Sequence, residues 1–179
     1  MAIAKSIESY LKKAKITVEV VPHKKVFTVY DLAQTLKEKF DNIAKTLLVK
    51  ADKQYFLVVM PANYRLDEKK FKQALAVKKV GIASEKEMSS RFKVKPGAMT
   101  PFGAIHKLEV ITDKSLLKAT SALFGAGSFT ESLRLKVKDY LKVAVPRIEN
   151  IAYKIPLKLQ VIRKPAKSKP KKRVQRKKR

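Results

Sequence analysis

The chain has 179 residues, which is enough for one domain and a tail. It contains no cysteine, which excludes disulfides, thiolate metal sites and a cysteine nucleophile, and its two histidines, His23 and His106, argue against a zinc site. No apolar stretch reaches the roughly 18 residues of a membrane span, and residues 1–8 lack the apolar core of a signal sequence. We therefore expect a cytoplasmic protein without membrane contact, metal or cofactor.

The formal net charge is +27, from 42 Lys+Arg against 15 Asp+Glu. Eleven of the basic residues and none of the acidic ones lie between Arg163 and Arg179. The remaining 31 basic and 15 acidic residues still give residues 1–162 a charge of +16. Because the body as well as the tail is positive, we favour a nucleic-acid partner over a general gain in solubility.

The first elements are predicted from helical and strand periodicities. An amphipathic helix is predicted over residues 3–14, with Ile3, Ile7, Tyr10 and Leu11 on one face. Residues 16–20 alternate as in a strand, and Pro22 and His23 close it. Thr28 is a typical N-cap for a helix whose apolar stripe reaches Phe40.

Two apolar runs at the centre, residues 42–49 and 55–62, are separated by a turn at Asp52-Lys53. Runs of this length bounded by turn residues predict a buried pair of strands. Lys45 lies at the beginning of the first run. A lysine in this place can lie half in the core and half in a cleft, or simply extend from a strand end into solvent.

The rest of the chain alternates between short helices and strands. We expect a loop at residues 63–65, followed by a helix capped by Asp67 and a strand over 78–83. A capping box at Ser84 and Glu87 predicts the next helix. A loop over 96–103, a strand over 108–112 and a helical turn from Asp113 come after it. Strands at 121–124 and 130–135 flank Gly125-Ala126-Gly127 as a hairpin, and a last helix covers 137–143. Beyond this helix, Pro146 and Pro156 interrupt regular structure.

These elements predict an α+β fold with a mixed sheet flanked by helices. We expect one domain over residues 1–160. The basic tail, residues 161–179, has too little apolar surface to fold and is predicted to be disordered.

Several segments together resemble the YbaK family, whose domain is shared with the editing insertion of prolyl-tRNA synthetase. The matching segments are Pro22-His23, Asp31-Leu32-Ala33, Ile43-Ala44-Lys45-Thr46-Leu47, residues 57–62, Leu66-Asp67, Gly97-Ala98-Met99-Thr100-Pro101-Phe102-Gly103, Asp113, Leu116 and Phe124-Gly125-Ala126-Gly127. The sharpest is the glycine-x-x-x-proline loop from Gly97 to Pro101. The resemblance covers roughly residues 15–145 and implies a strongly curved, barrel-like, mostly antiparallel sheet flanked by helices.

The resemblance also implies a function, which is trans-editing by hydrolysis of mischarged aminoacyl-tRNA of the Cys-tRNA(Pro) or Ala-tRNA(Pro) type. Lys45 would be the catalytic residue, and the substrate would be bound by the loop with Gly97, Ala98, Met99 and Pro101. Gly125 and His23 are further candidates for substrate binding that we add from their positions in the sequence. Aminoacyl-tRNA would be the partner, with an aminoacyl-tRNA synthetase as a second candidate. Basic tail residues would track the tRNA phosphates: Arg163, Lys164, Lys171, Lys172 and Arg173.

The bond to be broken is an activated ester, so hydrolysis needs a positioned nucleophile and stabilisation of the oxyanion. Lys45 can position the substrate as an ammonium, which we prefer, or transfer a proton if its pKa is lowered. No spacing suggests a Ser-His pair, and Ser128-Phe129-Thr130 replaces a histidine that some related editing domains carry. The nucleophile is then water or a group of the substrate itself.

Simpler interpretations remain for each feature. The loop at Gly97 can be an ordinary turn, Gly125-Ala126-Gly127 a plain hairpin, and His23 a structural histidine. The second hypothesis for the whole chain is a non-catalytic RNA-binding module on the same fold.

Overall fold

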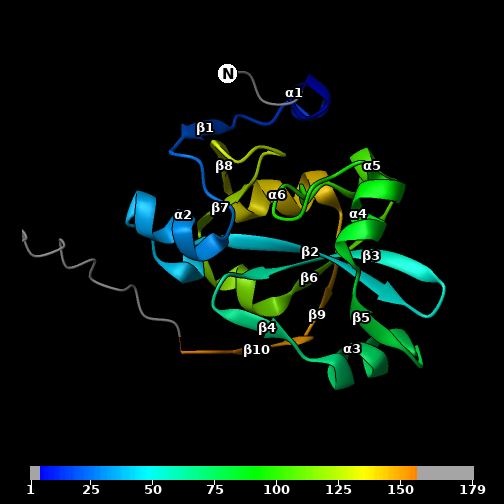
Figure 1. Ribbon diagram of the computed structural model, residues 1–179. Helices are drawn as coiled ribbons and strands as arrows, with labels where there is room; N and C mark the ends of the chain where they lie inside the picture. The colour runs from blue at the N-terminus through cyan, green and yellow to red at the C-terminus, as the bar shows by residue number, and fades with distance from the viewer. Residues whose placement is uncertain (1–4, 157–179) are drawn as a thin grey trace, which may run out of the picture.

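The computed structural model describes residues 5–156, which form helices and three sheets (Figure 1). The elements are α1 (Lys5–Lys13), β1 (Glu19–Pro22), α2 (Val29–Leu36), η1 (Phe40–Asn42), β2 (Ala44–Ala51), β3 (Gln54–Pro61), β4 (Tyr64–Leu66), α3 (Glu68–Leu75), β5 (Val80–Ile82), α4 (Glu85–Phe92), α5 (Gly103–His106), β6 (Glu109–Asp113), η2 (Lys114–Lys118), β7 (Ser121–Gly125), β8 (Glu131–Lys136), α6 (Val137–Ala144), β9 (Arg147–Glu149) and β10 (Ala152–Lys154).

The largest sheet has the strand order β5-β2-β3-β6-β9. Its centre is the predicted antiparallel pair β2–β3, which extends from Ala44 opposite Pro61 to Ala51 opposite Gln54. β6 and β9 join in parallel, so the sheet is mixed as predicted. Because β5 pairs only with residues 49–51 of β2, the other end of β2 keeps a free edge.

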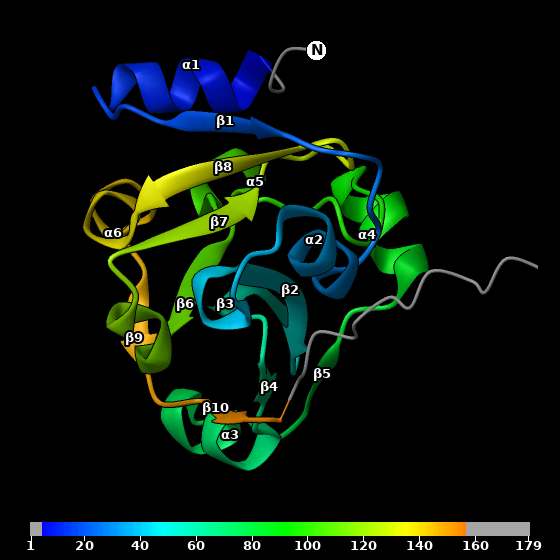
Figure 2. The ribbon, with the colours of Figure 1, turned by 90° about the vertical axis from the view of Figure 1, so that its left-hand side faces the viewer.

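A second sheet, β1-β8-β7, lies above α2 and the β2–β3 hairpin in Figure 2, and the small β4–β10 pair lies at the opposite end beside α3. The second sheet approaches β2 through one isolated bridge between Ile43 and Leu123. The expected single barrel-like sheet is therefore wrong, because the described strands divide into three sheets. Most strand pairs are antiparallel, as expected.

The predicted helix caps are confirmed. The Thr28 side chain accepts from the Asp31 amide, the Asp67 carboxylate accepts from two amides of α3, and Ser84 and Glu87 form the reciprocal capping box. These bonds satisfy amides that the first turn of a helix leaves without partners.

Three short strands were not predicted. β4 replaces the loop expected at residues 63–65, and β9 and β10 fall in the region that the prolines were expected to interrupt. The strand predicted over 16–20 begins only at Glu19. Such short, partly exposed strands owe their existence to a partner strand far away in the sequence, and local periodicity does not encode that partner.

Three buried clusters form the core, on the two faces of the large sheet and around α2. No helix within residues 5–156 is long and apolar enough to cross a bilayer. That part of the chain also lacks any group of three or more His, Asp or Glu side chains placed to hold a metal. The predictions for the tail, including the tRNA-binding residues between Arg163 and Arg173, lie outside the described residues.

Candidate functional site

A cavity of about 230 Å³ lies beside the free edge of β2. Four segments that are distant in the sequence enclose it: residues 23–32, the beginning of β2, the loop before α5 and the β7–β8 turn. Within the described part of the chain, its titratable lining residues are Lys45 and His23, and no carboxylate faces it. The lining also includes Phe27, Thr46, Gly97, Met99, Gly125, Ser128 and Ser132.

Lys45 is the second residue of β2, and its half-buried ammonium is held from one side. Nζ donates to the carbonyl of Ala62 at 3.3 Å and to the carbonyl of Tyr64. The carbonyls of Ala62 and Tyr64 lie near Lys45 because the segment after β3 folds over β2. The Ala62 amide donates to the Ile43 carbonyl at 2.7 Å and holds this segment in place. An ammonium has three N–H groups, so one is left for a ligand.

The charge of Lys45 is also tuned by its surroundings. Burial, and secondarily the nearby Arg65 guanidinium, lowers the pKa of Lys45 from 10.5 to about 8. At neutral pH the ammonium form still predominates, so the side chain offers a positive charge with little water around it. Such a charge interacts more strongly with a developing anion than a fully solvated one does.

The glycine-proline loop packs tightly against its neighbours. Gly97 has φ +82°, and a Cβ at this position would lie 2.7 Å from the carbonyl oxygen of Phe27. A Cβ at Gly125 would lie 2.7 Å from the carbonyl oxygen of Met99. Only glycine fits at either position without a shift. The amides of Gly97 and Met99 donate no hydrogen bond to another described residue, and both residues line the cavity.

The structure brings most of the predicted site residues together. Gly97, Met99, Gly125 and His23 line the same cavity as Lys45. Ala98 instead lines a second cavity on the other side of the loop, and Pro101 is buried and lines neither of the two.

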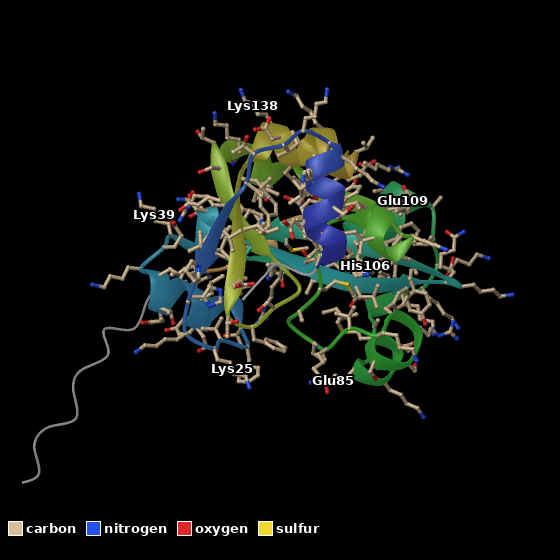
Figure 3. The ribbon with its side chains drawn as sticks, turned by 90° about the horizontal axis from the view of Figure 1, so that it is seen from above. Lys25, Lys39, Glu85, His106, Glu109 and Lys138 are labelled. Atoms are coloured by element: carbon tan, nitrogen blue, oxygen red, sulfur yellow. The ribbon has the colours of Figure 1, made fainter. Side chains whose placement is uncertain are left out.

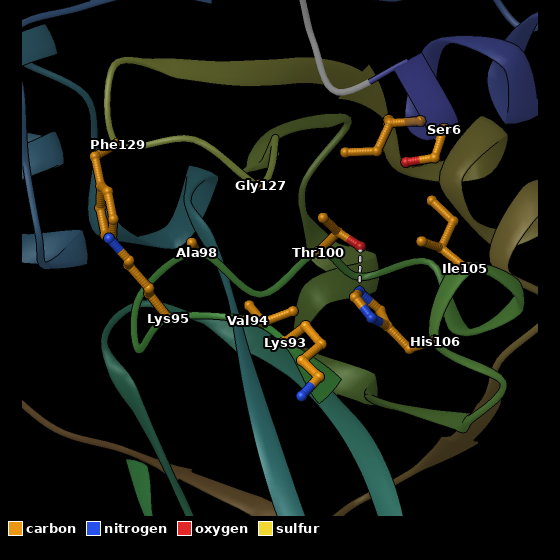
Figure 4. Close-up of a pocket in the computed structure, with 11 residues that line it drawn as sticks. Ser6, Lys93, Val94, Lys95, Ala98, Thr100, Ile105, His106, Gly127 and Phe129 are labelled. Atoms are coloured by element: carbon orange, nitrogen blue, oxygen red, sulfur yellow. Dashed lines mark hydrogen bonds between the residues drawn. The ribbon is translucent and has the colours of Figure 1, made fainter. Parts of the chain in front are cut away.

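The second cavity, of about 370 Å³, lies behind the loop (Figure 4). There His106 Nε2 lies 2.9 Å from the hydroxyl of the buried Thr100, so the imidazole supports the loop from behind. Burial lowers the pKa of His106, which favours the neutral ring. His106 is the last residue of the short helix α5, which holds its ring behind the loop.

Two polar features of the main cavity were not predicted. The hydroxyl of Thr46 is buried without a hydrogen-bond partner among the described residues. Leaving a buried hydroxyl unpaired costs about 1–3 kcal/mol, which marks it as a candidate to bind a ligand. The second feature is a hydroxyl–imidazole contact, with Ser132 Oγ 3.0 Å from His23 Nε2. Sequence spacing carries no signal for it, because the two residues are 109 positions apart.

The mouth of the cavity carries an aromatic ring and positive charge. Phe27 is 60% exposed, and the Lys25 ammonium lies 5.1 Å from the centre of its ring. Within residues 5–156, 30 basic residues outnumber 15 acidic ones, so positive charge is not confined to this mouth. In Figure 3, Lys25, Lys39 and Lys138 extend outward on different sides of the molecule. Exposed aromatic rings beside cations are typical of surfaces that bind single-stranded nucleic acid.

Comparison with known proteins supports one family. The aminoacyl-tRNA editing domain family matches residues 23–143. The prolyl-tRNA editing protein ProX of Acetoanaerobium sticklandii is 25% identical over 149 residues, which cover 80% of this chain and 91% of ProX. The multifunctional Ser/Thr-tRNA deacylase ProXp-y of Escherichia coli K12 is 28% identical over 98 residues, which cover 54% of this chain and 59% of that protein. The crystal structure of hypothetical protein APE2540 has the same fold, with a TM-score of 0.76, 21% identity and coverage of 82% of this chain and 99% of that one.

Proposed function

Because the chain belongs to the aminoacyl-tRNA editing domain family, we propose that it is a trans-editing hydrolase that deacylates mischarged aminoacyl-tRNA. The names of its relatives, an editing protein and a tRNA deacylase, support hydrolysis of the ester between amino acid and tRNA. The single observation that carries the proposal is the ammonium of Lys45, desolvated at the wall of a small cavity opposite a loop with free amides.

In this proposal the aminoacyl group enters the cavity and its ester carbonyl lies near the remaining N–H of Lys45. The ammonium and the amides of Gly97 and Met99 stabilise the negative charge that develops on the carbonyl oxygen during attack. Lys45 acts as a positioned cation, which its neutral-pH charge state supports. Phe27 and Lys25 receive the single-stranded end of the tRNA at the mouth.

We further propose that the substrates carry small amino acids, as in Cys-tRNA(Pro) or Ala-tRNA(Pro). A cavity of about 230 Å³ falls below the roughly 300–1,000 Å³ of sites for drug-sized ligands, which favours a small acyl group. The partner is then aminoacyl-tRNA, and a synthetase that produces the mischarged species is a second expected partner.

The test is deacylation of a panel of mischarged tRNAs by the wild type and Lys45→Ala. Loss of the oxyanion-stabilising cation should lower kcat by about 10²-fold, while tRNA affinity measured by filter binding changes little. Lys53→Ala is the control, because Lys53 is exposed in the β2–β3 turn and equally removes one charge. If the wild type binds tRNA but hydrolyses none of the panel, the chain is instead a non-catalytic RNA-binding module.

A further inference from the structure

The contact between Ser132 and His23 has the geometry of an activated nucleophile. Ser132 Oγ lies 3.0 Å from His23 Nε2, and His23 Nδ1 lies 2.8 Å from the carbonyl oxygen of Lys24. A carbonyl only accepts hydrogen bonds, so Nδ1 carries the proton and donates it to Lys24. In the neutral imidazole Nε2 is then an acceptor, and the Ser132 hydroxyl must donate to it. A hydroxyl that donates to an imidazole fixed on its far side is the arrangement of serine hydrolases.

The fold holds both side chains in place. Ser132 pairs with Val21 of β1 on one side and with Gly125 of β7 on the other, so it lies in the middle strand of the second sheet. His23 directly follows β1, and its backbone amide donates to the Thr130 carbonyl at 2.8 Å, which continues the pairing with β8. The imidazole is therefore placed by the sheet beside the serine, independently of any ligand.

Both residues line the cavity of Lys45, and Gly125 beside Ser132 leaves room because it has no side chain. Ser128 lines the cavity too, but its hydroxyl lies 3.1 Å from the hydroxyl of Thr130 rather than beside an imidazole. Thr100 and His106 form the other hydroxyl–imidazole pair of residues 5–156, and they line the cavity behind the loop. Among the residues that the structure describes, only the Ser132–His23 pair therefore combines a histidine base with the cavity proposed to receive the ester.

We propose that Ser132 is a nucleophile and His23 its general base, in a covalent route for the hydrolysis. This inference rests on the proposed deacylase function and names the attacking group. The Ser132 oxygen bonds to the ester carbonyl carbon while its proton passes to His23 Nε2. The bond to the ribose oxygen breaks, and that oxygen takes the proton, which releases tRNA and leaves an aminoacyl ester on Ser132. Water then attacks this ester with His23 again taking the proton and returning it to Ser132, which releases the amino acid.

A fluorophosphonate probe tests the pair without any tRNA, because an activated serine displaces its fluoride and forms a stable phosphonate ester. We expect one label per wild-type chain, located by peptide mass spectrometry at Ser132. Ser128→Ala should be labelled like the wild type, Ser132→Ala should not be labelled, and His23→Gln should react about 100-fold more slowly. An unlabelled Ser132 in the wild type, or equally fast labelling in His23→Gln, overturns the proposal.

Deacylation kinetics provide the second arm. Ser132→Ala should lower kcat by about 10²–10³-fold with KM within about threefold, while Ser90→Ala keeps the wild-type rate, because Ser90 is exposed on α4 and lies outside the cavity. Equal melting temperatures of the two alanine variants exclude misfolding as the cause. Full activity of Ser132→Ala overturns the serine route and leaves the deacylase function standing. A wild type that is labelled at Ser132 but hydrolyses no mischarged tRNA contradicts the deacylase function and leaves the activated serine standing.

Discussion

At the scale of single residues, the behaviour of Lys45 depends on the balance between burial and hydrogen bonding. Two backbone carbonyls accept from its ammonium, while burial and Arg65 favour the neutral amine and lower its pKa to about 8. Below that pH the group is an ammonium, and above it the charge is lost. The two roles considered for Lys45, a fixed cation and a proton-transfer group, therefore predict opposite responses to alkaline pH.

We predict that the Lys45-dependent part of the rate falls with rising pH. The measurement is the ratio of wild-type to Lys45→Ala deacylation rates, after the rate of base-catalysed hydrolysis without enzyme has been subtracted from each. For a cation with a pKa of about 8, the ratio should fall about tenfold between pH 7 and pH 9. A ratio that increases over this interval would show that the neutral amine is the active form.

Lys45 and Gly97 were predicted as site residues from the family resemblance and Gly125 from its place in a glycine turn, and all three line one cavity. The contact between Ser132 and His23 could not be predicted, because it depends on the pairing of β1 with β8 across the sheet. The unpaired hydroxyl of Thr46 was not predicted either, because its burial depends on segments that are distant in the sequence and cover this end of β2.

At the scale of elements, the cavity is formed by a close approach between the loop before α5 and the β7–β8 turn. The Met99 carbonyl abuts the α-carbon of Gly125, while His106 supports Thr100 from behind. The loop is therefore held between the turn and α5, which fixes the position of Gly97 and Met99 in the cavity lining.

This packing predicts that Gly125→Ala impairs the site more than the fold. The new methyl group would lie 2.7 Å from the Met99 carbonyl oxygen and force the loop away, so we expect kcat/KM for deacylation to fall by at least about tenfold. Gly81→Ala is the matched control, because a Cβ at Gly81 would meet no atom within 4 Å and β5 is remote from the cavity. Similar losses in both variants would contradict the role assigned to the turn.

The elements themselves were largely predictable where a cap or a long apolar run marks them, as for α2, α3, α4 and the β2–β3 pair. The division into three sheets was not, because it depends on which strands meet. Asp113 illustrates the difference. Its role in starting η2 was predicted, but one carboxylate oxygen also accepts from the Ile151 amide at 2.8 Å, a contact that connects β6 to the segment before β10.

At the scale of the whole molecule, positive charge dominates both parts of the chain, and eleven basic residues lie in the segment from Arg163 onward. A truncation before Arg163 removes these charges and leaves the cavity residues intact. We expect weaker tRNA binding and a shallower decrease of log K with log salt, because fewer phosphates are neutralised. Turnover at saturating substrate should be unchanged, and its collapse would mean that the tail contributes to the site.

A crystal structure with a non-hydrolysable aminoacyl-adenosine, in which an amide replaces the ester, tests directly whether the aminoacyl group binds beside Lys45. We expect the aminoacyl group to occupy the cavity between Lys45, Met99 and Gly125, with its carbonyl oxygen within hydrogen-bonding distance of Lys45 Nζ. An aminoacyl group bound elsewhere, with the Lys45 ammonium still held only by the carbonyls of Ala62 and Tyr64, would contradict this expectation.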